Sequence, residues 1–225
     1  MDEELEAGKD RAWREIAEID RAHERGDLDD EGWHAAVAAL VVPAYLAAKT
    51  PEGGSGSTRD RRGWERARSL LADAVARGQT FLDVGCANGL LMESLARWAG
   101  VEPYGVDISS ELVDEARRRL PHWADRIWIG NAASWRPPMR FDVARSGLEY
   151  VPPPRRRDYV AHLLSFADRL VVGVFNEERD DRALERAVES WGFRVAGRVE
   201  RRHSHPRLAY RAFWIDGDGR ATSPD

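Results

Sequence analysis

Two aspartates and two glycines are the residues of this sequence best suited to hold a ligand. Asp83 and Gly85 end one short apolar run, and Gly89 follows just before a helical pattern begins. Glycines in such a turn let backbone N–H groups approach a ligand closely, and the carboxylate before the first glycine suits a cationic group. Asp107 ends the next apolar run, where an acid can accept hydrogen bonds from both hydroxyls of a ribose.

Polar or small residues also close the next two apolar runs. Asn131 and Ala132 follow the third run, and the fourth ends at Ser146 and Gly147. Ligands of an open parallel sheet bind outside the carboxyl ends of its strands, so four consecutive strand ends of this kind predict one binding site. The G-x-G-x-x-G fingerprint of dinucleotide-binding proteins is missing, which disfavours a nicotinamide-dependent oxidoreductase.

The elements that must position these residues alternate from residue 80 onward. We expect strands at 80–85, 102–107, 126–130, 141–146 and 169–175, and helices at 88–98, 109–119, 153–168 and 178–191. Such alternation predicts right-handed crossovers and a parallel sheet that is covered on both faces. Two further apolar runs, 193–199 and 207–215, have no helix between them and predict an antiparallel hairpin at one edge.

Two helical patterns precede this region. The first runs over residues 3–24, and the second carries Trp33 and Leu40 on its apolar stripe and should end or kink at Pro43. Residues 50–58 are rich in glycine and serine, which predicts a mobile loop or a domain boundary. A third helix is expected over about 60–77.

The predicted fold is therefore α/β. It is a Rossmann-like, doubly wound, mostly parallel sheet of seven strands with an antiparallel C-terminal hairpin and an N-terminal helical cap. We expect the helical cap and flexible loop over 1–58 and the ligand-binding domain over 59–220. A chain of 225 residues can bury a core of its own, and its single cysteine, Cys86, excludes an internal disulfide. No metal site is predicted.

Residues 80–215 resemble a class I S-adenosylmethionine-dependent methyltransferase. The turn Asp83–Gly89 is similar to the family's first motif, with Ala87 where glycine is commoner. Asp107 is similar to the acid that holds the ribose, and Asn131-Ala132 to the pair that reads adenine, where Asp is commoner than Asn.

A later segment carries the resemblance further. Leu148-Glu-Tyr-Val151 is similar to the family's Leu-Glu-His-Val, with Tyr150 in place of the histidine near the transferred methyl group. Glu149 and Tyr150 are therefore the catalytic candidates, although the resemblance does not say whether either acts as a base. Asn176 and Glu177, after the fifth strand, are further candidates facing the site.

The resemblance implies S-adenosylmethionine as the cofactor. The residues it implies for cofactor binding lie at the strand ends and on the third helix. In similar enzymes this helical region closes over the cofactor. The implied residues are Asp83, Gly85, Cys86, Ala87, Asn88, Gly89, Asp107, Ile108, Asn131, Ala132, Ser146, Gly147, Trp64 and Arg68. Arg68 could reach the carboxylate of the cofactor.

The expected function is methyl transfer from S-adenosylmethionine to a small-molecule acceptor. A cofactor-binding or interaction module of the same fold without catalysis is the alternative, and an NAD-dependent oxidoreductase is disfavoured. The sequence leaves open the acceptor and the attacked atom. It also leaves open whether the N-terminal helices form a lid over the site or pack against each other or a second subunit.

Charge and hydropathy set the expected partners. Residues 1–31 hold 13 acidic and 5 basic residues, a local net charge of −8, and the whole chain carries −5, so no basic face for nucleic acid is expected. An acidic N-terminus without a following apolar run argues against a secretory signal, and no run approaches the roughly 20 residues of a membrane span. We expect a cytoplasmic monomer or homodimer.

Overall fold

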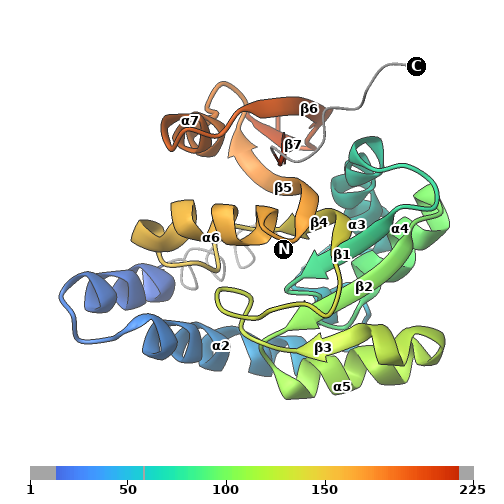
Figure 1. Ribbon diagram of the computed structural model, residues 1–225, viewed down its shortest axis with the longest axis horizontal. Coiled ribbons are helices and arrows are strands. Elements are labelled where there is room, and N and C mark those ends of the chain that lie inside the picture. The colour runs from blue at the N-terminus through green and yellow to red at the C-terminus, as the bar shows by residue number, and fades with distance from the viewer. Residues whose placement is uncertain (1–13, 58, 218–225) are drawn as a thin grey trace.

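A sheet of seven strands lies at the centre of the structure, a computed structural model that describes residues 14–57 and 59–217. The strand order is β3-β2-β1-β4-β5-β7-β6 (Figure 1). The strands are β1 (Thr80–Val84), β2 (Glu102–Asp107), β3 (Ile127–Ile129), β4 (Phe141–Ser146), β5 (Ala167–Glu178), β6 (Val195–Arg202) and β7 (Leu208–Asp216). The order reverses between β1 and β4, which is the switch point where doubly wound sheets bind ligands.

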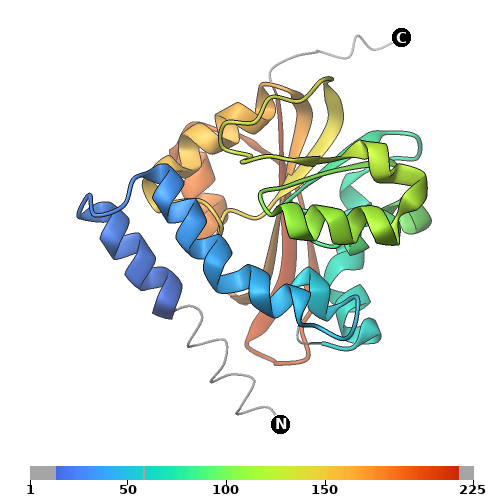
Figure 2. The ribbon, with the colours of Figure 1, turned by 90° about the horizontal axis from the view of Figure 1, so that it is seen from below.

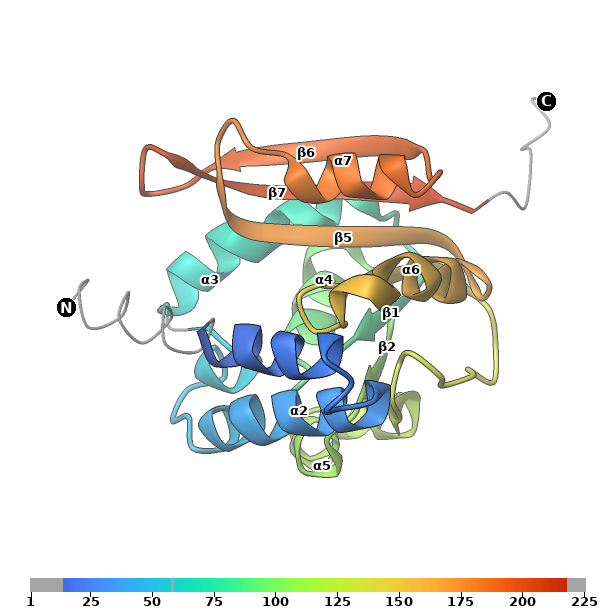
Figure 3. The same ribbon diagram turned by 90° about the vertical axis from the view of Figure 1, so that its left-hand side faces the viewer.

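The two ends of the sheet differ in direction. β1 to β5 pair in parallel, whereas β7 pairs antiparallel with both β5 and β6. Figure 3 shows β5, β7 and β6 lying one above another as this C-terminal edge. The predicted fold class is confirmed, hairpin included. It is the second strand of the hairpin, β7, that pairs with the parallel part of the sheet.

Helices cover both faces of the sheet. They are α2 (Asp30–Leu46), α3 (Arg61–Arg68), α4 (Leu90–Ala99), α5 (Ser110–Arg119), α6 (Arg156–Leu164) and α7 (Ala183–Ser190), with short 3₁₀ helices η1 (Gly53–Ser55), η2 (Ser69–Ala74), η3 (Pro121–Arg126) and η4 (Pro153–Arg155). Residues 14–24 are also helical. Asp29, Asp60 and Ser109 start α2, α3 and α5 by accepting a hydrogen bond from the backbone N–H three residues on.

Several predicted boundaries need correction. The helix expected over 60–77 is α3 followed by η2, because the chain tightens into 3₁₀ geometry at Ser69. α2 continues through Pro43 to Leu46, so its predicted end at the proline is wrong. β5 is longer than expected and delays α7, and η4 delays α6. None of the described helices, within residues 14–57 and 59–217, is long and apolar enough to cross a membrane.

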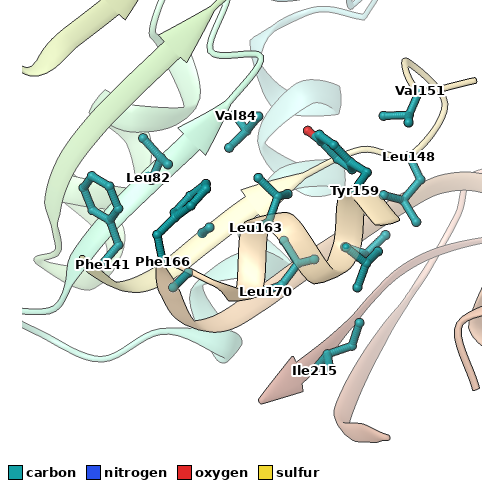
Figure 4. Packing of buried hydrophobic residues seen from close by; sticks show 14 of the residues in the cluster. Leu82, Val84, Phe141, Leu148, Val151, Tyr159, Leu163, Phe166, Leu170 and Ile215 are labelled. Carbon is teal, nitrogen blue, oxygen red and sulfur yellow. The ribbon is translucent and has the colours of Figure 1, made fainter. Parts of the chain in front are cut away.

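Apolar side chains pack on each face of the sheet because neighbouring strand residues point to opposite sides. Figure 4 shows one cluster, in which Leu82, Phe141 and Leu170 pack beneath Leu163 of α6. The cluster on the other face joins η2 and α4 to Phe81 and its neighbours. Burying each large apolar side chain contributes about 1.5–3 kcal/mol, so these two clusters hold the strand ends in register.

The N-terminal helices lie across the carboxyl ends of the strands. In Figure 2 the sheet is seen nearly edge-on, and α2 crosses in front of it. Trp33 of α2 is fully buried, and its Nε1 donates a hydrogen bond to Asp20 Oδ1 at 2.9 Å, which ties α2 to the helix before it. Ile16 is also buried, whereas Trp13 of the same predicted stripe lies outside the described residues.

The glycine- and serine-rich segment packs against the turn after β1 and against α3. Asn88 Nδ2 donates to the Pro51 carbonyl at 2.8 Å, and Trp64 Nε1 donates to Ser55 Oγ at 2.9 Å. Gly54 is buried so tightly that a Cβ there would lie 2.6 Å from Asn88 Nδ2. The small residues of this segment therefore allow close contact with the turn after β1.

Gly89 offers a test of how tightly that turn is packed. Its φ is +74°, and a Cβ there would lie 2.6 Å from Leu120 Cδ1, whereas Gly78 has φ +80° and no atom within 4 Å. Both Gly→Ala changes should cost about 1–2 kcal/mol for the left-handed backbone, and Gly89→Ala should cost about 1 kcal/mol more for overpacking. Urea unfolding of the two variants measures the difference. Equal losses would mean that Leu120 moves aside freely.

Candidate active site

A cavity of about 210 Å³ lies between the carboxyl ends of the strands and α2. Its floor is made by the turns that follow β1, β2, β3 and β4, and α3 closes one side. Its roof is one face of α2, formed by Trp33, His34, Val37, Ala38, Val41, Val42 and Tyr45. The structure thus brings the four predicted strand ends and the N-terminal helical segment to one enclosed space.

The turn after β1 exposes its backbone to this cavity. Gly85 has φ +75°, and a Cβ there would meet no atom within 4 Å, so the space beside it is open. Ala87, with φ +47°, is the one non-glycine residue in the described chain with a positive φ. A left-handed alanine costs about 1 kcal/mol, so the turn must be held by other contacts.

Asp107 supplies those contacts. Its Oδ2 accepts a hydrogen bond from the Ala87 N–H at 2.8 Å, and its Oδ1 accepts one from the Ser109 N–H at 3.0 Å. The carboxylate is only 8% exposed, and burial raises its pKa while these N–H donors lower it. Each oxygen keeps a second acceptor position. Asp107 can therefore accept from ribose hydroxyls while it holds the turn.

Asp83 is paired with a residue that the sequence analysis missed. It is 2% exposed, and Arg145 of β4 approaches it, with Nη1 3.4 Å from Oδ1. Burial raises the pKa of Asp83 to about 6, although the nearby guanidinium lowers it. The two residues are opposite each other in the β1–β4 register. Their 62-residue separation hides this pairing until the strand order is known.

Asn131, Ala132 and Ile108 line the far end of the cavity. Asn131 Oδ1 accepts a hydrogen bond from the Ala133 N–H at 3.0 Å, which fixes the amide. A carbonyl oxygen has two acceptor positions, so one is left for an exocyclic amine. Ile108 is 41% exposed and offers an apolar surface beside it. This end can hold a planar base such as adenine.

Two predicted cofactor residues are not in the cavity lining. The Asn88 side chain turns away to Pro51, and its Oδ1 accepts from the Leu90 N–H at 3.2 Å. Gly89 faces Leu120. Both shape the turn instead of facing the space beneath α2. Cys86 does line the cavity, but it is 3% exposed and burial raises the pKa of its thiol well above the usual value.

The catalytic candidates Glu149 and Tyr150 both line the cavity. The Glu149 carboxylate folds back over Gly147, where a Cβ would collide with it. The Tyr150 hydroxyl is 3.2 Å from the hydroxyl of Tyr45 in the roof. Desolvation by the surrounding protein raises the pKa of Tyr150 well above its ordinary value, so this phenol is protonated at neutral pH and is a donor.

The remaining candidates lie on α3, β4 and β5. Arg68 lines the cavity with its guanidinium 3.7 Å from the centre of the Phe175 ring, and burial lowers its pKa to about 10, which leaves it charged at neutral pH. Ser146, at the end of β4, bonds the Tyr159 hydroxyl at 2.8 Å. The side chains of Asn176 and Glu177 lie outside the described part of the chain.

Comparison with known proteins places this geometry in a family. Residues 81–167 match the family model described as "Methyltransferase domain", a span that contains the turn after β1, Asp107, Asn131 and the end of β4. This span of the chain is therefore a methyltransferase domain. The resemblance drawn from the sequence and the cofactor it implied are thereby confirmed. The open backbone at Gly85 and the acceptor positions of Asp107 fit that cofactor.

Curated relatives match over part of their length. A trans-aconitate 2-methyltransferase of Rhodopseudomonas palustris (strain BisB5) is 34% identical over 111 residues, which cover 48% of this chain and 41% of the relative. The enzyme of the same name from Afipia carboxidovorans is 36% identical over 91 residues, 38% of this chain and 34% of the relative. The match thus spans well under half of each curated relative.

Solved structures share the fold. The N-methyltransferase NodS of Bradyrhizobium japonicum WM9, in complex with S-adenosylhomocysteine, has a TM-score of 0.58 and 16% identity, and the match covers 80% of this chain and 97% of NodS. The magnesium protoporphyrin IX methyltransferase of Synechocystis PCC 6803, with S-adenosylmethionine bound, has a TM-score of 0.55 and 20% identity, covering 84% and 98%.

Asp107 gives the sharpest test of cofactor binding. Removing a charged hydrogen-bond partner should weaken binding by about 1–3 kcal/mol, so Asp107→Ala should raise the Kd for S-adenosylhomocysteine about fivefold to 150-fold. The control is Asp114→Ala, on an exposed position of α5. Calorimetry gives the Kd, and S-adenosylmethionine but not NADH should raise the melting temperature. Unchanged affinity in folded Asp107→Ala would place the ribose elsewhere.

Proposed function

We propose that this protein transfers the methyl group of S-adenosylmethionine to a small-molecule acceptor held beneath α2. The observation that carries the proposal is the cavity beneath α2, in which the exposed turn after β1 and Asp107 face a roof of mostly apolar side chains. S-adenosylmethionine supplies an activated methyl group on a sulfonium. The protein's part is therefore to align the two reactants and exclude water.

Five of the predicted residues have distinct parts in this scheme. The backbone around Gly85 would lie against the methionine half of the cofactor, with Arg68 available for its carboxylate. Asp107 would hold the ribose, and Asn131 with Ile108 the adenine. These assignments follow the lining of the cavity and the acceptor positions that Asp107 and Asn131 keep.

The roof supports a small acceptor. Tyr45 reaches Tyr150 across the cavity, and its hydroxyl also packs against Gly56, which has φ +76° and no room for a Cβ. The bond from Asn88 to Pro51 anchors the segment that follows α2. A roof over the strand ends leaves less room for a macromolecular acceptor than for a small molecule. The curated relatives are named for trans-aconitate, a small molecule, which also supports this acceptor class.

The sequence left open whether the N-terminal helices form a lid over the site or pack against each other, and their contacts fit both roles. Trp33 bonds Asp20 of the preceding helix, so the two helices pack together, and the same α2 lines the cavity. We therefore propose that residues 1–58 form a cap and residues 59–220 a cofactor-binding domain. A cap that shapes the acceptor site and keeps water out is a lid.

A methylation assay tests the activity. Purified protein, S-adenosylmethionine labelled on the methyl group and a panel of small acceptors that includes trans-aconitate should yield labelled product and S-adenosylhomocysteine in equal amounts. Asp107→Ala should lower kcat/KM for the cofactor by the same 5- to 150-fold as its affinity, and Asp114→Ala should not change it. Cofactor binding without product from any acceptor would favour a non-catalytic binding module.

Limited proteolysis tests the lid. S-adenosylhomocysteine should protect residues 50–64 from cleavage, because ligand contacts favour the closed form of a segment that opens locally. Asn88→Ala removes the bond to the Pro51 carbonyl and should speed cleavage in this segment several-fold in the free protein. Ser190→Ala, on the distant α7, is the control. Equal cleavage rates with and without S-adenosylhomocysteine would contradict a lid.

A further inference from the structure

Arg145 is a charged side chain of the cavity to which the scheme above gives no task. It extends from β4 into the cavity lining, and its side chain is 12% exposed. Nη1 carries the contact to Asp83, while Nε is buried and has no hydrogen-bond partner within the described chain. Buried polar atoms are nearly always hydrogen-bonded, so a guanidinium that lines a cavity and keeps unused donors is a candidate for binding a ligand that accepts from it.

The groups around Arg145 are mostly hydrogen-bond donors. Arg68 is a second guanidinium, and it interacts electrostatically with Arg145. The Tyr45, Tyr150 and Tyr159 hydroxyls all have raised pKa values, mainly through desolvation, and that of Tyr159 is raised to about 12. At neutral pH these phenols stay protonated. The Tyr159 hydroxyl donates to Ser146 Oγ, because Ser146 donates its own proton to the Gly147 carbonyl, so the proton left for a ligand is one of the Tyr45–Tyr150 pair. This part of the cavity is therefore suited to an anionic oxygen ligand.

The nearby carboxylates do not remove the preference of this part of the cavity for an anionic ligand. Asp83 is opposite Arg145 and contacts Nη1 of its guanidinium. The Glu149 carboxylate is folded over Gly147. The cofactor carries one carboxylate, for which Arg68 is available. Arg145 is then left for an anionic group that comes from the other reactant.

We propose that Arg145 binds a carboxylate of the methyl acceptor, so that the acceptor is a small carboxylic acid. This inference rests on the proposed methyl transfer. A guanidinium is the side chain best matched to a carboxylate, because its N–H groups lie in one plane and always carry a charge. The guanidinium of Arg145 would hold one oxygen and leave the other to react.

The same assignment accounts for Tyr150 at the position where the family has a histidine. A carboxylic acid with a pKa near 4 is already ionised at neutral pH, so its oxygen needs no general base. The carboxylate oxygen would form a bond to the methyl carbon while the carbon–sulfur bond breaks and its electron pair stays on sulfur. No proton moves, and the product is a methyl ester. A protonated Tyr150 can orient this reaction without accepting a proton.

The chemical form of the product is the first test. Mild alkali releases the label of a methyl ester as volatile methanol, whereas methyl groups on nitrogen, on carbon or in an ether stay in solution. The probes are trans-aconitate, fumarate and succinate, each against its amide. We expect alkali-labile label from acids only. Alkali-stable product, or methylation of the amides, would overturn the inference and leave methyl transfer standing, whereas no product at all would count against the function itself.

Binding without turnover is the second test. With S-adenosylhomocysteine bound, Arg145→Gln should raise the calorimetric Kd of the best acid at least tenfold and leave the Kd of S-adenosylhomocysteine within about twofold. Arg140→Gln, just before β4 and paired with exposed Asp168, is the matched control and should change neither. An acid affinity that survives Arg145→Gln, or failure of all three acids to bind, would overturn the proposal.

Two more variants distinguish loss of acid binding from loss of folding. Arg145→Gln leaves Asp83 buried without a cation, whereas Arg145→Lys keeps the charge and the double variant Asp83→Asn with Arg145→Gln removes both charges. Thermal melting identifies which variants fold. Arg145→Lys should recover part of the acid affinity, and the double variant should be as weak as Arg145→Gln. Wild-type acid affinity in the folded double variant would show that Arg145 acts only as the partner of Asp83.

Discussion

The buried carboxylate of Asp107 is the interaction on which the rest of the site depends. The turn after β1 contains a left-handed alanine, which is unfavourable by itself, and the Ala87 N–H bond to Asp107 holds it. That bond joins the ends of β1 and β2, and the Ser109 N–H bond joins the same carboxylate to the start of α5. One side chain thus fixes the shape of the cavity floor and presents acceptor positions to it. Such preorganisation saves reorganisation when a ligand binds.

The alternation of apolar runs and amphipathic segments was enough to predict the sheet, its hairpin and the four strand ends that meet at the cavity. These features depend on local periodicity and on the handedness of crossovers, which the sequence carries directly. The Asp83–Arg145 pair depends instead on which strands are neighbours and in which register. The sequence pattern therefore did not identify Arg145 as a site residue. Its position two residues before Gly147 could have marked it as lying at the same end of the sheet.

The glycine and serine content of residues 50–58 predicts flexibility, but it does not show how these small residues pack. The segment after α2 is rich in glycine and serine, but Gly54 and Gly56 are small because Asn88 and Tyr45 press against them. A glycine that permits close packing cannot be told from one in a free loop until the neighbour is known. Pro43 misled for a related reason. It removes a single hydrogen-bond donor near the end of α2, a loss that the packing of the helix over the cavity can offset.

Charge placement explains how the cavity can combine a cationic cofactor with buried arginines. Isolated buried charges are costly, and they persist where partners offset the desolvation. Asp83 offsets Arg145 on one side, and the aromatic ring of Phe175 receives Arg68 on the other. Neither contact uses every donor of its guanidinium, as the unpartnered Nε of Arg145 shows within the described chain. An acceptor on a ligand would relieve the residual cost of those donors, and an anion would do so most strongly, so the ion pair that stabilises the empty cavity also favours a negatively charged group beside it.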